Sequence, residues 1–519
     1  MDIPIPIIDI FAGPGGLGEG FSALKGKNGE PLFKIKLSIE KDEFAHRTLE
    51  LRAFYRQFVG KSIPPEYYDY LQGKISRKTL FEKYKAEALK AKNEAWKATL
   101  GKTSDEKVRT RIKEALNGAV NWLLIGGPPC QAYSLVGRSR IRGKDKKDKR
   151  KYREDRRHFL YKEYLQILAD HQPPVFVMEN VKGLLSSRRI QKQSTFDLII
   201  SDLKTPLNTK QKNSDKLLEY TLFSVSKERV DNSEEVEPRD FIVRSENYGI
   251  PQARHRIIIL GIRSDVYKSD PKVLDIVEQH TSIDDVISDL PPLRSGLSKE
   301  VDTPEKWSDA IQSIAKAKWL DSEKVSVELK QAIISALKKV NASLMRGDPF
   351  VQFSIPPEKQ SKLEWYIDKT WAGLCNHESR AHIREDLHRY FFASVFARLN
   401  DRSPTLNDFP PGLLPKHENV QEALTGSKFN DRFRVQISGW PSTTVVSHIS
   451  KDGHYYIHYD PSQCRSLTVR EAARLQTFPD NYLFEGNRTQ QYHQVGNAVP
   501  PMLAYKIAET VYKVLESSK

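Results

Sequence analysis

The sequence predicts an α/β fold built on a mostly parallel sheet, into which a smaller second domain is inserted. Short apolar runs alternate with helical patterns up to residue 294, and a glycine-rich turn follows the first run directly. From residue 295 the pattern changes to lysine- and serine-rich stretches, and apolar helical spacing returns near the carboxyl end. The 519 residues are enough for two or more folding units.

The first strand is expected over residues 4–11, and a glycine-rich turn follows it. Three glycines of this turn satisfy the pattern G-x-G-x-x-G: Gly13, Gly15 and Gly18. Their missing side chains let a ligand approach the backbone closely. A second strand over 33–39 ends in Glu40, at the place where a carboxylate can bind ribose hydroxyls. Taken alone, the turn suits dinucleotide and adenosyl cofactors equally, and Glu40 is also compatible with a solvated strand end.

Residues 61–118 form a lysine-rich interval that we expect to be an inserted helical segment. Apolar and small side chains recur there at helical spacing: Leu80, Tyr84, Ala88, Ala91 and Ala95. This spacing predicts an amphipathic helix with a charged outer face, which is typical of a surface helix.

A cysteine follows the next apolar run, residues 119–125, on a stiff loop. The loop contains Gly126, Gly127, Pro128 and Pro129 directly before Cys130, and these residues prevent the strand from continuing. Cys130 is therefore expected at the carboxyl end of a parallel strand, where open α/β sheets bind their ligands. The alternative is a buried structural cysteine, because free cysteines are often simply buried.

A second candidate catalytic residue, Glu179, ends the apolar strand expected over residues 175–178. A carboxylate there is partly desolvated, which favours its neutral, proton-donating form. The alternative is a salt-bridged glutamate at a strand end. Arg254 and Arg256 precede the strand expected over 257–262 and share one face of an extended chain, which suits phosphate or a base carbonyl.

The charge of the chain favours a polyanionic partner. The formal net charge is +15. Residues 138–157 carry twelve lysines and arginines against four acids, a local charge of +8. Such a run is often a solvated segment, but its place shortly after Cys130 favours contact with phosphates.

The remaining composition excludes several classes of protein. The three cysteines lie far apart and give neither a disulfide framework nor a zinc pattern, so no metal is expected. No apolar stretch approaches the roughly 20 residues of a membrane span. The first residues lack the basic and apolar regions of a secretory signal. We therefore expect a cytoplasmic protein without a membrane partner.

Four of these motifs resemble those of the cytosine-5 DNA methyltransferases and follow in that family's order. Residues 128–131 resemble the family's nucleophile motif, and residues 11–16 its S-adenosylmethionine loop. Residues 179–181 resemble its acid motif, and residues 252–256 its paired-arginine motif. The resemblance extends from Ile7 to Val511 and implies a Rossmann-like S-adenosylmethionine-dependent methyltransferase fold with an inserted target recognition domain.

The resemblance also implies domain boundaries. Residues 1–294 would form the catalytic domain, 295–465 the target recognition domain, and 466–519 a return segment that completes the catalytic domain. In the return segment, Thr468 and Glu471 form a capping-box pattern at the start of a helix.

Roles for single residues follow from the resemblance. Cys130 would attack carbon 6 of a cytosine, Glu179 helped by Arg254 would stabilise the ring at N3, and Arg256 would support the same site. The residues expected at the cofactor are Phe11, Gly13, Pro14, Gly15, Gly16, Glu40, Pro129, Leu160, Asn497 and Ala498. Those expected at the DNA are Gln131, Ser134, Arg138, Arg140 and Gln252. The aspartate that the family usually carries after its third strand has no counterpart that we can place.

The function implied is methyl transfer from S-adenosylmethionine to carbon 5 of a flipped-out cytosine in a specific sequence of double-stranded DNA. A paired restriction endonuclease and a monomeric enzyme are implied with it. One alternative is an RNA cytosine methyltransferase of the same architecture. Another is a DNA-binding protein without catalysis, although Cys130, Glu179 and Arg254 are all present. A nicotinamide oxidoreductase would leave residues 128–131 unexplained.

Overall fold

The computed structural model describes residues 3–129, 160–185, 195–206, 219–229, 237–359, 363–415, 420, 424 and 430–517. Several expected site residues lie outside the described residues: Cys130, Gln131, Ser134, Arg138 and Arg140. The basic run 138–157 also lies outside them.

Eight strands of the described chain form one central sheet, with the order β3-β2-β1-β4-β5-β9-β6 and β7 paired with β9. Their bounds are β1 Ile5–Ile10, β2 Phe33–Glu40, β3 Ala95–Lys97, β4 Leu123–Gly126, β5 Val175–Val181, β6 Tyr220–Ser224, β7 Ile242–Arg244 and β9 His255–Arg263. The pairs from β3 across to β5 are parallel, and β9 runs antiparallel to β5, β6 and β7. The predicted mostly parallel sheet is confirmed.

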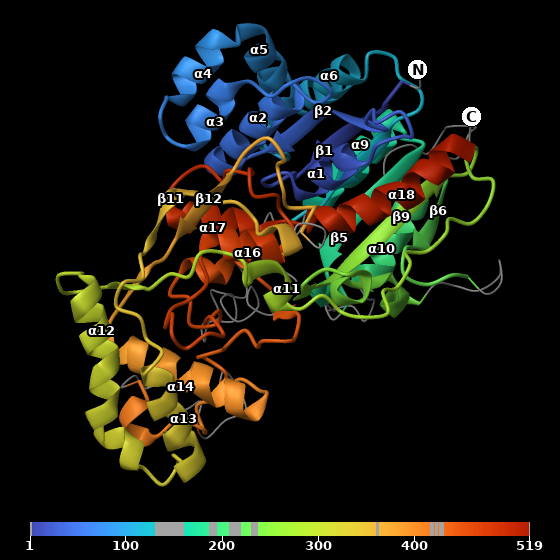
Figure 1. The fold of residues 1–519 in the computed structure, drawn as a ribbon. Coiled ribbons are helices and arrows are strands. Elements are labelled where there is room, and N and C mark those ends of the chain that lie inside the picture. Colours follow the sequence, from blue (N-terminus) through green and yellow to red (C-terminus); the bar gives the residue numbers. More distant parts are fainter. Residues whose placement is uncertain are drawn as a thin grey trace.

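Helices cover both faces of this sheet because its inner strands are apolar on both sides. One face packs against α1 (Gly16–Ala23) and α18 (Pro501–Ser517), which lie side by side along the sheet (Figure 1). The predicted apolar stripe of α18 is buried there through Leu503, Ile507 and Val511. The other face packs against α6 (Asp105–Leu116), α9 (Leu160–His171) and α10 (Thr195–Lys204).

The interval 61–118 differs from the expected inserted helical segment. Its first part joins α2 (Glu43–Arg56) in a helical lobe made of α3 (Pro65–Leu71), α4 (Arg77–Lys83) and α5 (Lys85–Glu94). The single helix expected around residue 84 is broken at Tyr84, whose φ of −117° and ψ of 57° are not helical. Its last part supplies β3 and α6 to the central sheet and its cover. A three-residue edge strand is too short to show a period of two in the sequence.

A second hydrophobic core lies in the range 297–464. It is built by α12 (Pro304–Gln312), α13 (Val327–Leu337) and α14 (Arg384–Asn400), which form the lower lobe in Figure 1. The strand-like residues 433–437 form only an isolated bridge between Val435 and Ile457. A short parallel pair, β10 (Gly296–Leu297) and β13 (Ala381–His382), lies near the point where the chain enters this range.

One hairpin from the range 297–464 packs away from the lower lobe, against the helical lobe of α2–α5. It consists of β11 (Gly347–Gln352) and β12 (Gly373–Glu378). Cys375 of β12 belongs to the core of the α2–α5 lobe, and β12 also contacts α16 (Val469–Leu475). The range expected for target recognition is therefore not a single separate body in space.

The return segment begins with the predicted capping box. The Thr468 hydroxyl accepts the Glu471 backbone N–H at 3.1 Å, and the Glu471 carboxylate accepts that of Thr468 at 2.7 Å. Helix α17 (Arg488–Asn497) follows and leads into α18. The short β14 (Ser442–Thr443) pairs with β8 (Gln252–Ala253), and α11 (Ile283–Ile287) packs beside α16.

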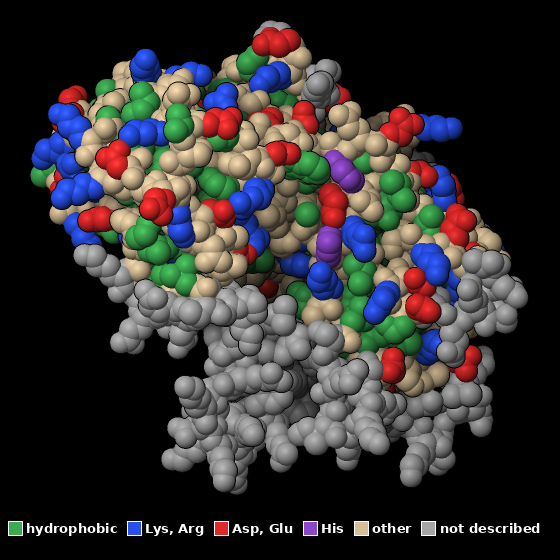
Figure 2. Space-filling view, turned by 90° about the horizontal axis from the view of Figure 1, so that it is seen from below, with side chains coloured by type: hydrophobic (Ala, Val, Ile, Leu, Met, Phe, Trp, Pro, Cys, Tyr) green, Lys and Arg blue, Asp and Glu red, His purple; other side chains and the backbone are tan. Residues whose placement is uncertain are grey.

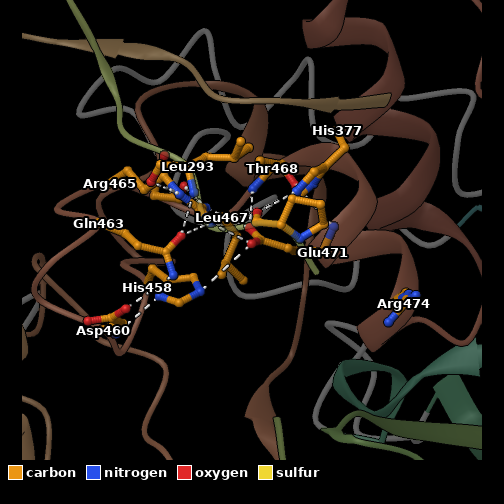
Figure 3. A network of polar contacts seen from close by, with 12 residues as sticks. Leu293, His377, His458, Asp460, Gln463, Arg465, Leu467, Thr468, Glu471 and Arg474 are labelled. Atoms are coloured by element: carbon orange, nitrogen blue, oxygen red, sulfur yellow. Dashed lines mark hydrogen bonds and ion pairs between the residues drawn. The ribbon is translucent and has the colours of Figure 1, made fainter. Parts of the chain in front are cut away.

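A buried polar network holds the chain where it leaves the first unit and where it returns (Figure 3). Arg465 forms a bidentate ion pair with Glu471 at 2.6 and 2.7 Å and donates from Nε to the Leu293 carbonyl at 3.0 Å. The Gln463 side-chain oxygen accepts from Arg465 and from the Leu293 N–H. Residues 293 and 465 are thus fixed side by side, although 172 positions separate them in the chain.

The described surface is rich in charge. Figure 2 shows lysine and arginine side chains over the face seen from below, intermingled with aspartate and glutamate. None of the described helices has the length and apolar character needed to cross a bilayer. Within the same residues, no three His, Cys, Asp or Glu side chains are grouped in a way that could hold a metal ion.

Candidate active site

Several of the predicted site residues that the structure describes lie at one edge of the sheet. β1, β4 and β5 are parallel neighbours, so the segments that follow Ile10, Gly126 and Val181 leave the sheet at the same edge. β9 is antiparallel to β5, which brings its first residues to that edge as well. The glycine turn, the loop leading to Cys130, Glu179 and Arg256 therefore approach one another although they are far apart in sequence.

Glu179 lies directly beside the start of the loop that carries Cys130. Gly127 approaches it so closely that a Cβ at this position would lie 2.7 Å from the Glu179 Oε2 atom. The next residue, Asn180, donates from Nδ2 to the Pro128 carbonyl at 3.4 Å. A side chain at position 127 would therefore have to displace the Glu179 carboxylate, and the Pro128 carbonyl is held against the strand that carries the candidate acid. Pro129, expected at the cofactor, is partly exposed here.

Arg256 is the guanidinium that pairs with Glu179. Its Nε lies 2.8 Å from Glu179 Oε1, and the two side chains are only 12% and 14% exposed. Burial lowers the pKa of Arg256, and the negative charge of Glu179 opposes that shift. This nearly buried ion pair fixes the direction of the carboxylate, and it is also the salt-bridged arrangement that the sequence left open as the alternative for Glu179.

Arg254 occupies a different place. Its side chain is 1% exposed and donates to the Val445 carbonyl at 2.7 Å and to the Gly496 carbonyl at 3.2 Å. Burial and the nearby charge of Arg256 hold the pKa of Arg254 well below its usual value. The sequence predicted two arginines at the acid; the structure brings Arg256 into contact and uses Arg254 to tie β8 to the segments around residues 445 and 496.

The prediction that Gln252 contacts DNA is corrected by the structure. Its side chain is fully buried. The amide nitrogen donates to the Leu475 carbonyl at 3.0 Å, and the amide oxygen accepts the Val445 N–H at 2.8 Å. A side chain with its donors and acceptor satisfied inside the protein has none to offer a base. The sequence pattern could not reveal this, because an exposed and a buried glutamine look alike.

The glycine turn after β1 is strongly curved. Phe11, Gly13 and Gly15 all have positive φ values, of 56°, 57° and 97°. The Gly13 N–H donates to Glu40 Oε2 at 2.8 Å, which ties the turn to the end of β2. Burial raises the pKa of Glu40, while backbone N–H groups of Asp42, Gly13 and Lys41 oppose that rise. Apart from the chain neighbours of Gly13, no atom of the described residues lies within 4 Å of the place where a Gly13 Cβ would be, so this part of the structure leaves the backbone open to a ligand.

The return segment, residues 466–519, packs against the glycine turn. A Cβ at Gly16 would lie 2.1 Å from the Val499 carbonyl oxygen, so α1 begins in direct contact with the chain between α17 and α18. The Tyr482 hydroxyl donates to the Pro14 carbonyl at 2.5 Å. Asn497 at the end of α17 is exposed, and the next residue, Ala498, is buried. Leu160 begins α9 and is partly exposed.

Sequence reasoning missed two features beside the turn. Asp9 of β1 is fully buried, and neither carboxylate oxygen has a hydrogen-bond partner among the described residues. Burial raises the pKa of Asp9 well above its usual value. An acid inside the apolar run 4–11 was the signal available for it. The second feature is Tyr482, whose role depends on a contact between residues 468 positions apart and left no local signal.

The third strand is followed by Ala98, Thr99, Leu100 and Gly101. The first acid after β3 is Asp105, which already belongs to α6. No aspartate therefore stands directly behind the third strand, which agrees with the difficulty of placing one from the sequence.

Comparison with known proteins places the chain in a family. The model of the C-5 cytosine-specific DNA methylase family matches residues 71–209 and 238–513. The chain is 31% identical over 533 residues to the type II methyltransferase M.Bpa9945I of Bacillus paralicheniformis, covering 98% of this chain and 99% of that one. It is 28% identical over 437 residues to the DNA (cytosine-5-)-methyltransferase M.ApeKI of Aeropyrum pernix, covering 78% and 83%.

Among solved structures, a prophage-encoded DNA modification methyltransferase of E. coli aligns over 99% of both chains with 17% identity and a TM-score of 0.49. The family assignment rests on the match over most of the sequence and on the near full-length relative. The strand order and the residues gathered at the carboxyl edge agree with that assignment. The chain belongs to the C-5 cytosine-specific DNA methylase family and is a DNA (cytosine-5-)-methyltransferase.

Proposed function

We propose that this enzyme methylates carbon 5 of a flipped-out cytosine in a short specific sequence of double-stranded DNA, through a covalent adduct with Cys130. One observation carries the proposal most strongly. The Glu179 carboxylate, paired with Arg256, lies against Gly127, three residues before Cys130. In this proposal the Glu179 carboxyl group is the proton donor and the Cys130 thiol is the nucleophile, since attack on a cytosine ring requires both groups.

We propose S-adenosylmethionine as the methyl donor, and the glycine turn fits such a group. The open space beside Gly13 accommodates a ligand close to the backbone, and Glu40 at the end of β2 is placed for ribose hydroxyls. Phe11 would stack on the adenine, and the exposed Asn497 would lie toward the methionine end. Pro14, Gly15 and Gly16 would shape the turn, with Pro129, Leu160 and Ala498 at its margin. When bound, the donor supplies a methyl group on a positively charged sulfur.

The chemistry follows from the weakness of carbon 5 as a nucleophile. The Cys130 thiolate adds to carbon 6, and Glu179 stabilises the ring at N3, so that carbon 5 becomes enamine-like. Carbon 5 would then take the methyl group while the bond between that methyl group and the donor's sulfur breaks, and S-adenosylhomocysteine would leave. A base removes the proton from carbon 5, the bond to Cys130 breaks, and the double bond between carbons 5 and 6 is restored. Neither attacked atom is reachable inside the stacked duplex, so the base must leave it.

Arg256 and Arg254 have different roles in this proposal. Arg256 orients the Glu179 carboxylate directly. Arg254 acts as a positioning residue that holds the segment after β14 and the end of α17 against β8. Gln131, Ser134, Arg138 and Arg140 are proposed to contact the DNA, with the basic run 138–157 supplying phosphate contacts.

The relatives named as type II methyltransferases support a place in restriction–modification. We propose that methylation protects DNA from a paired restriction endonuclease and that the enzyme acts as a monomer in the cytoplasm. Purified enzyme, with its oligomeric state measured by light scattering, provides the starting material for the test.

The test is incubation with labelled S-adenosylmethionine and mixed-sequence duplex DNA, followed by mapping of the modified bases. We expect 5-methylcytosine in one short sequence context. Label in a matched RNA but not in DNA would replace the proposed substrate, and DNA binding without release of S-adenosylhomocysteine would replace the proposed activity.

The covalent step has its own test. DNA that carries 5-fluorocytosine at the mapped position has no proton to lose at carbon 5, so the adduct with Cys130 should accumulate. A denaturation-resistant enzyme–DNA complex is expected for the natural enzyme and should be missing for Cys130→Ser. A Cys130→Ser enzyme that still methylates at the natural rate would contradict the adduct.

A further inference from the structure

The indole of Trp440 is exposed where the lower lobe of α12, α13 and α14 adjoins the segments that pack on the central sheet. The chain has seven tryptophans, all among the described residues, and Trp440 is the one that is exposed, at 54%. It stands at the tip of an exposed turn formed with Ser438 and Gly439. In the described part of the chain, no aromatic ring or guanidinium stacks on it. Tryptophan is enriched at contact sites, because the indole combines a large apolar face with an N–H donor.

The turn that carries Trp440 is held from both sides. The indole Nε1 donates to Asp401, with distances of 3.2 and 3.4 Å to the two carboxylate oxygens. The Trp440 carbonyl accepts the Ile283 N–H at 2.9 Å. The Ser438 hydroxyl donates to Asp284 at 3.0 Å, and the Gly439 N–H donates to the same carboxylate. The indole is thus oriented before any partner arrives, which lowers the entropic cost of binding.

The anchors of Trp440 come from different units. Asp401 caps the end of α14 in the lower lobe, whereas Ile283 and Asp284 belong to α11, which lies between that lobe and the sheet in Figure 1. Two residues after Trp440 the chain enters β14, which is paired with β8. The next contacts are from Thr444 to the Ala253 carbonyl at 2.6 Å and from Arg254 to the Val445 carbonyl. A continuous hydrogen-bonded path therefore leads from Trp440 to the segment that presents Arg256 to Glu179.

The helix whose C-cap residue, Asp401, binds the indole also carries an exposed arginine, Arg398. Arg398 is exposed in the last turn of α14, three residues before Asp401, and forms no ion pair with a described residue. Residues three apart at the end of a helix share one face. Proteins hold nucleic acid with aromatic planes against bases and cations against phosphates, and α14 here carries both an exposed guanidinium and, at its C-cap, the carboxylate that orients the indole.

We propose that Trp440 is a DNA-contacting residue of this enzyme, whose indole packs against a nucleotide of the bound duplex flanking the target cytosine. The proposal rests on the proposed duplex DNA substrate and deepens it. Trp440 is anchored to the lower lobe through Asp401 and, through the pair β14 and β8, to the edge of the sheet that carries the candidate catalytic groups, so its contact would set the position of the DNA relative to both. It does not touch the reacting atoms, and its effect is on DNA binding.

The experiment compares Trp440→Ala and Trp440→Phe with the natural enzyme on mixed-sequence duplex DNA. Stacking of one base on an aromatic side chain changes affinity by roughly 5- to 150-fold. We therefore expect Trp440→Ala to weaken DNA binding by at least about fivefold and to raise the KM for DNA, with KM for S-adenosylmethionine and kcat within twofold. Trp440→Phe should recover part of the affinity. Leu89→Ala, which truncates a side chain that is 60% exposed on α5, is the matched control and should leave DNA binding unchanged.

Tryptophan fluorescence distinguishes direct contact with DNA from a purely structural role of Trp440. DNA should protect the exposed indole from quenching by acrylamide, and this protection should disappear in Trp440→Phe while the other six tryptophans remain. Arg398→Ala should reduce the salt dependence of binding by about one phosphate contact.

Two results would overturn the proposal: DNA affinity of Trp440→Ala within twofold of the natural enzyme, or acrylamide protection that persists in Trp440→Phe. Failure of the proposed function looks different, because the natural enzyme would then transfer no methyl group to DNA. If Trp440→Ala does not fold, Trp440→Phe and the quenching experiment still decide the outcome.

Discussion

Arg256 and Glu179 form an ion pair of 2.8 Å across two antiparallel strands, and both side chains are mostly buried. The strand register places Arg256 opposite Val181, so the pair is diagonal, two residues apart along β5. Diagonal neighbours of this kind are within reach of a long side chain such as arginine. The candidate acid is therefore oriented by the sheet itself and not by a loop.

Replacement of Glu179 by Gln should lower kcat strongly while preserving DNA binding. The amide keeps the size of the side chain but cannot carry the proton, and loss of a general acid costs on the order of 10²- to 10⁴-fold. The measurement is methyl transfer at saturating DNA, together with the Kd for DNA. Arg256→Lys keeps the charge without the planar guanidinium and should give an intermediate loss. Unchanged kcat in Glu179→Gln would remove Glu179 from the chemistry.

Gly16→Ala and Gly13→Ala should differ in kind. A Cβ at position 16 would lie 2.1 Å from the Val499 carbonyl oxygen, so α1 must move away from the chain that joins α17 and α18. We expect a lower Tm for Gly16→Ala. At position 13 a Cβ would meet no atom of the described, non-neighbouring residues within 4 Å, and the cost is the strain of a positive φ, about 1 kcal/mol.

Gly13→Ala should therefore fold but raise the KM for S-adenosylmethionine, because its new methyl group occupies the space open to the ligand. Thermal unfolding and steady-state kinetics with varied S-adenosylmethionine measure both variants. Equal losses of Tm in the two variants would contradict the packing argument, and an unchanged KM in Gly13→Ala would contradict the placement of the cofactor.

Arg254→Met should destabilise the protein. The substitution leaves the Val445 and Gly496 carbonyl groups without their buried donor. Each unsatisfied buried acceptor costs about 1–3 kcal/mol, so the two together should lower the free energy of unfolding by about 2–6 kcal/mol. Urea unfolding measures it. Arg402→Met is the matched control, since Arg402 pairs with Asp408 on the surface and should cost less than about 1 kcal/mol. A loss in Arg254→Met no larger than in this control would show that the buried contacts are not needed.

Stability should fall on acidification below pH 6.5 because of buried histidines. Burial lowers the pKa of His377 to about 4, and its ring nitrogens lie within hydrogen-bonding distance of the Thr468 hydroxyl and the Pro291 carbonyl. Burial also lowers the pKa of His458, which lies in the network of Figure 3. The unfolded chain takes up protons on these groups near pH 6.5, whereas the folded chain stays neutral until about pH 4.

Between these two values the unfolded state binds more protons, so each such histidine removes up to about 1.4 kcal/mol of stability per pH unit as the pH falls. Urea unfolding between pH 7 and about pH 5 measures the slope, and His377→Gln should make it shallower. A slope in His377→Gln equal to that of the natural enzyme would assign the acid sensitivity to other groups.

Much of the architecture could be read from local patterns. The strands at residues 5–10 and 175–181 are mostly apolar, because inner parallel strands are buried on both faces, whereas the strand at residues 33–40 alternates apolar with polar residues. The capping box at Thr468 and the apolar stripe of α18 were equally visible. The three-residue β3 was hidden within the expected insertion, because so short a strand carries no periodicity.

The sequence by itself determined the order of the motifs, the residue types at the site and the family to which they point. Only the tertiary structure decided which of two similar arginines reaches Glu179, that Gln252 is buried, and that Trp440 is exposed between two anchoring carboxylates. The physical reason is that the patterns that predict strands and helices depend on residues that are close together in the sequence. Burial and pairing are set by contacts between segments up to hundreds of residues apart, such as Gln252 with Leu475.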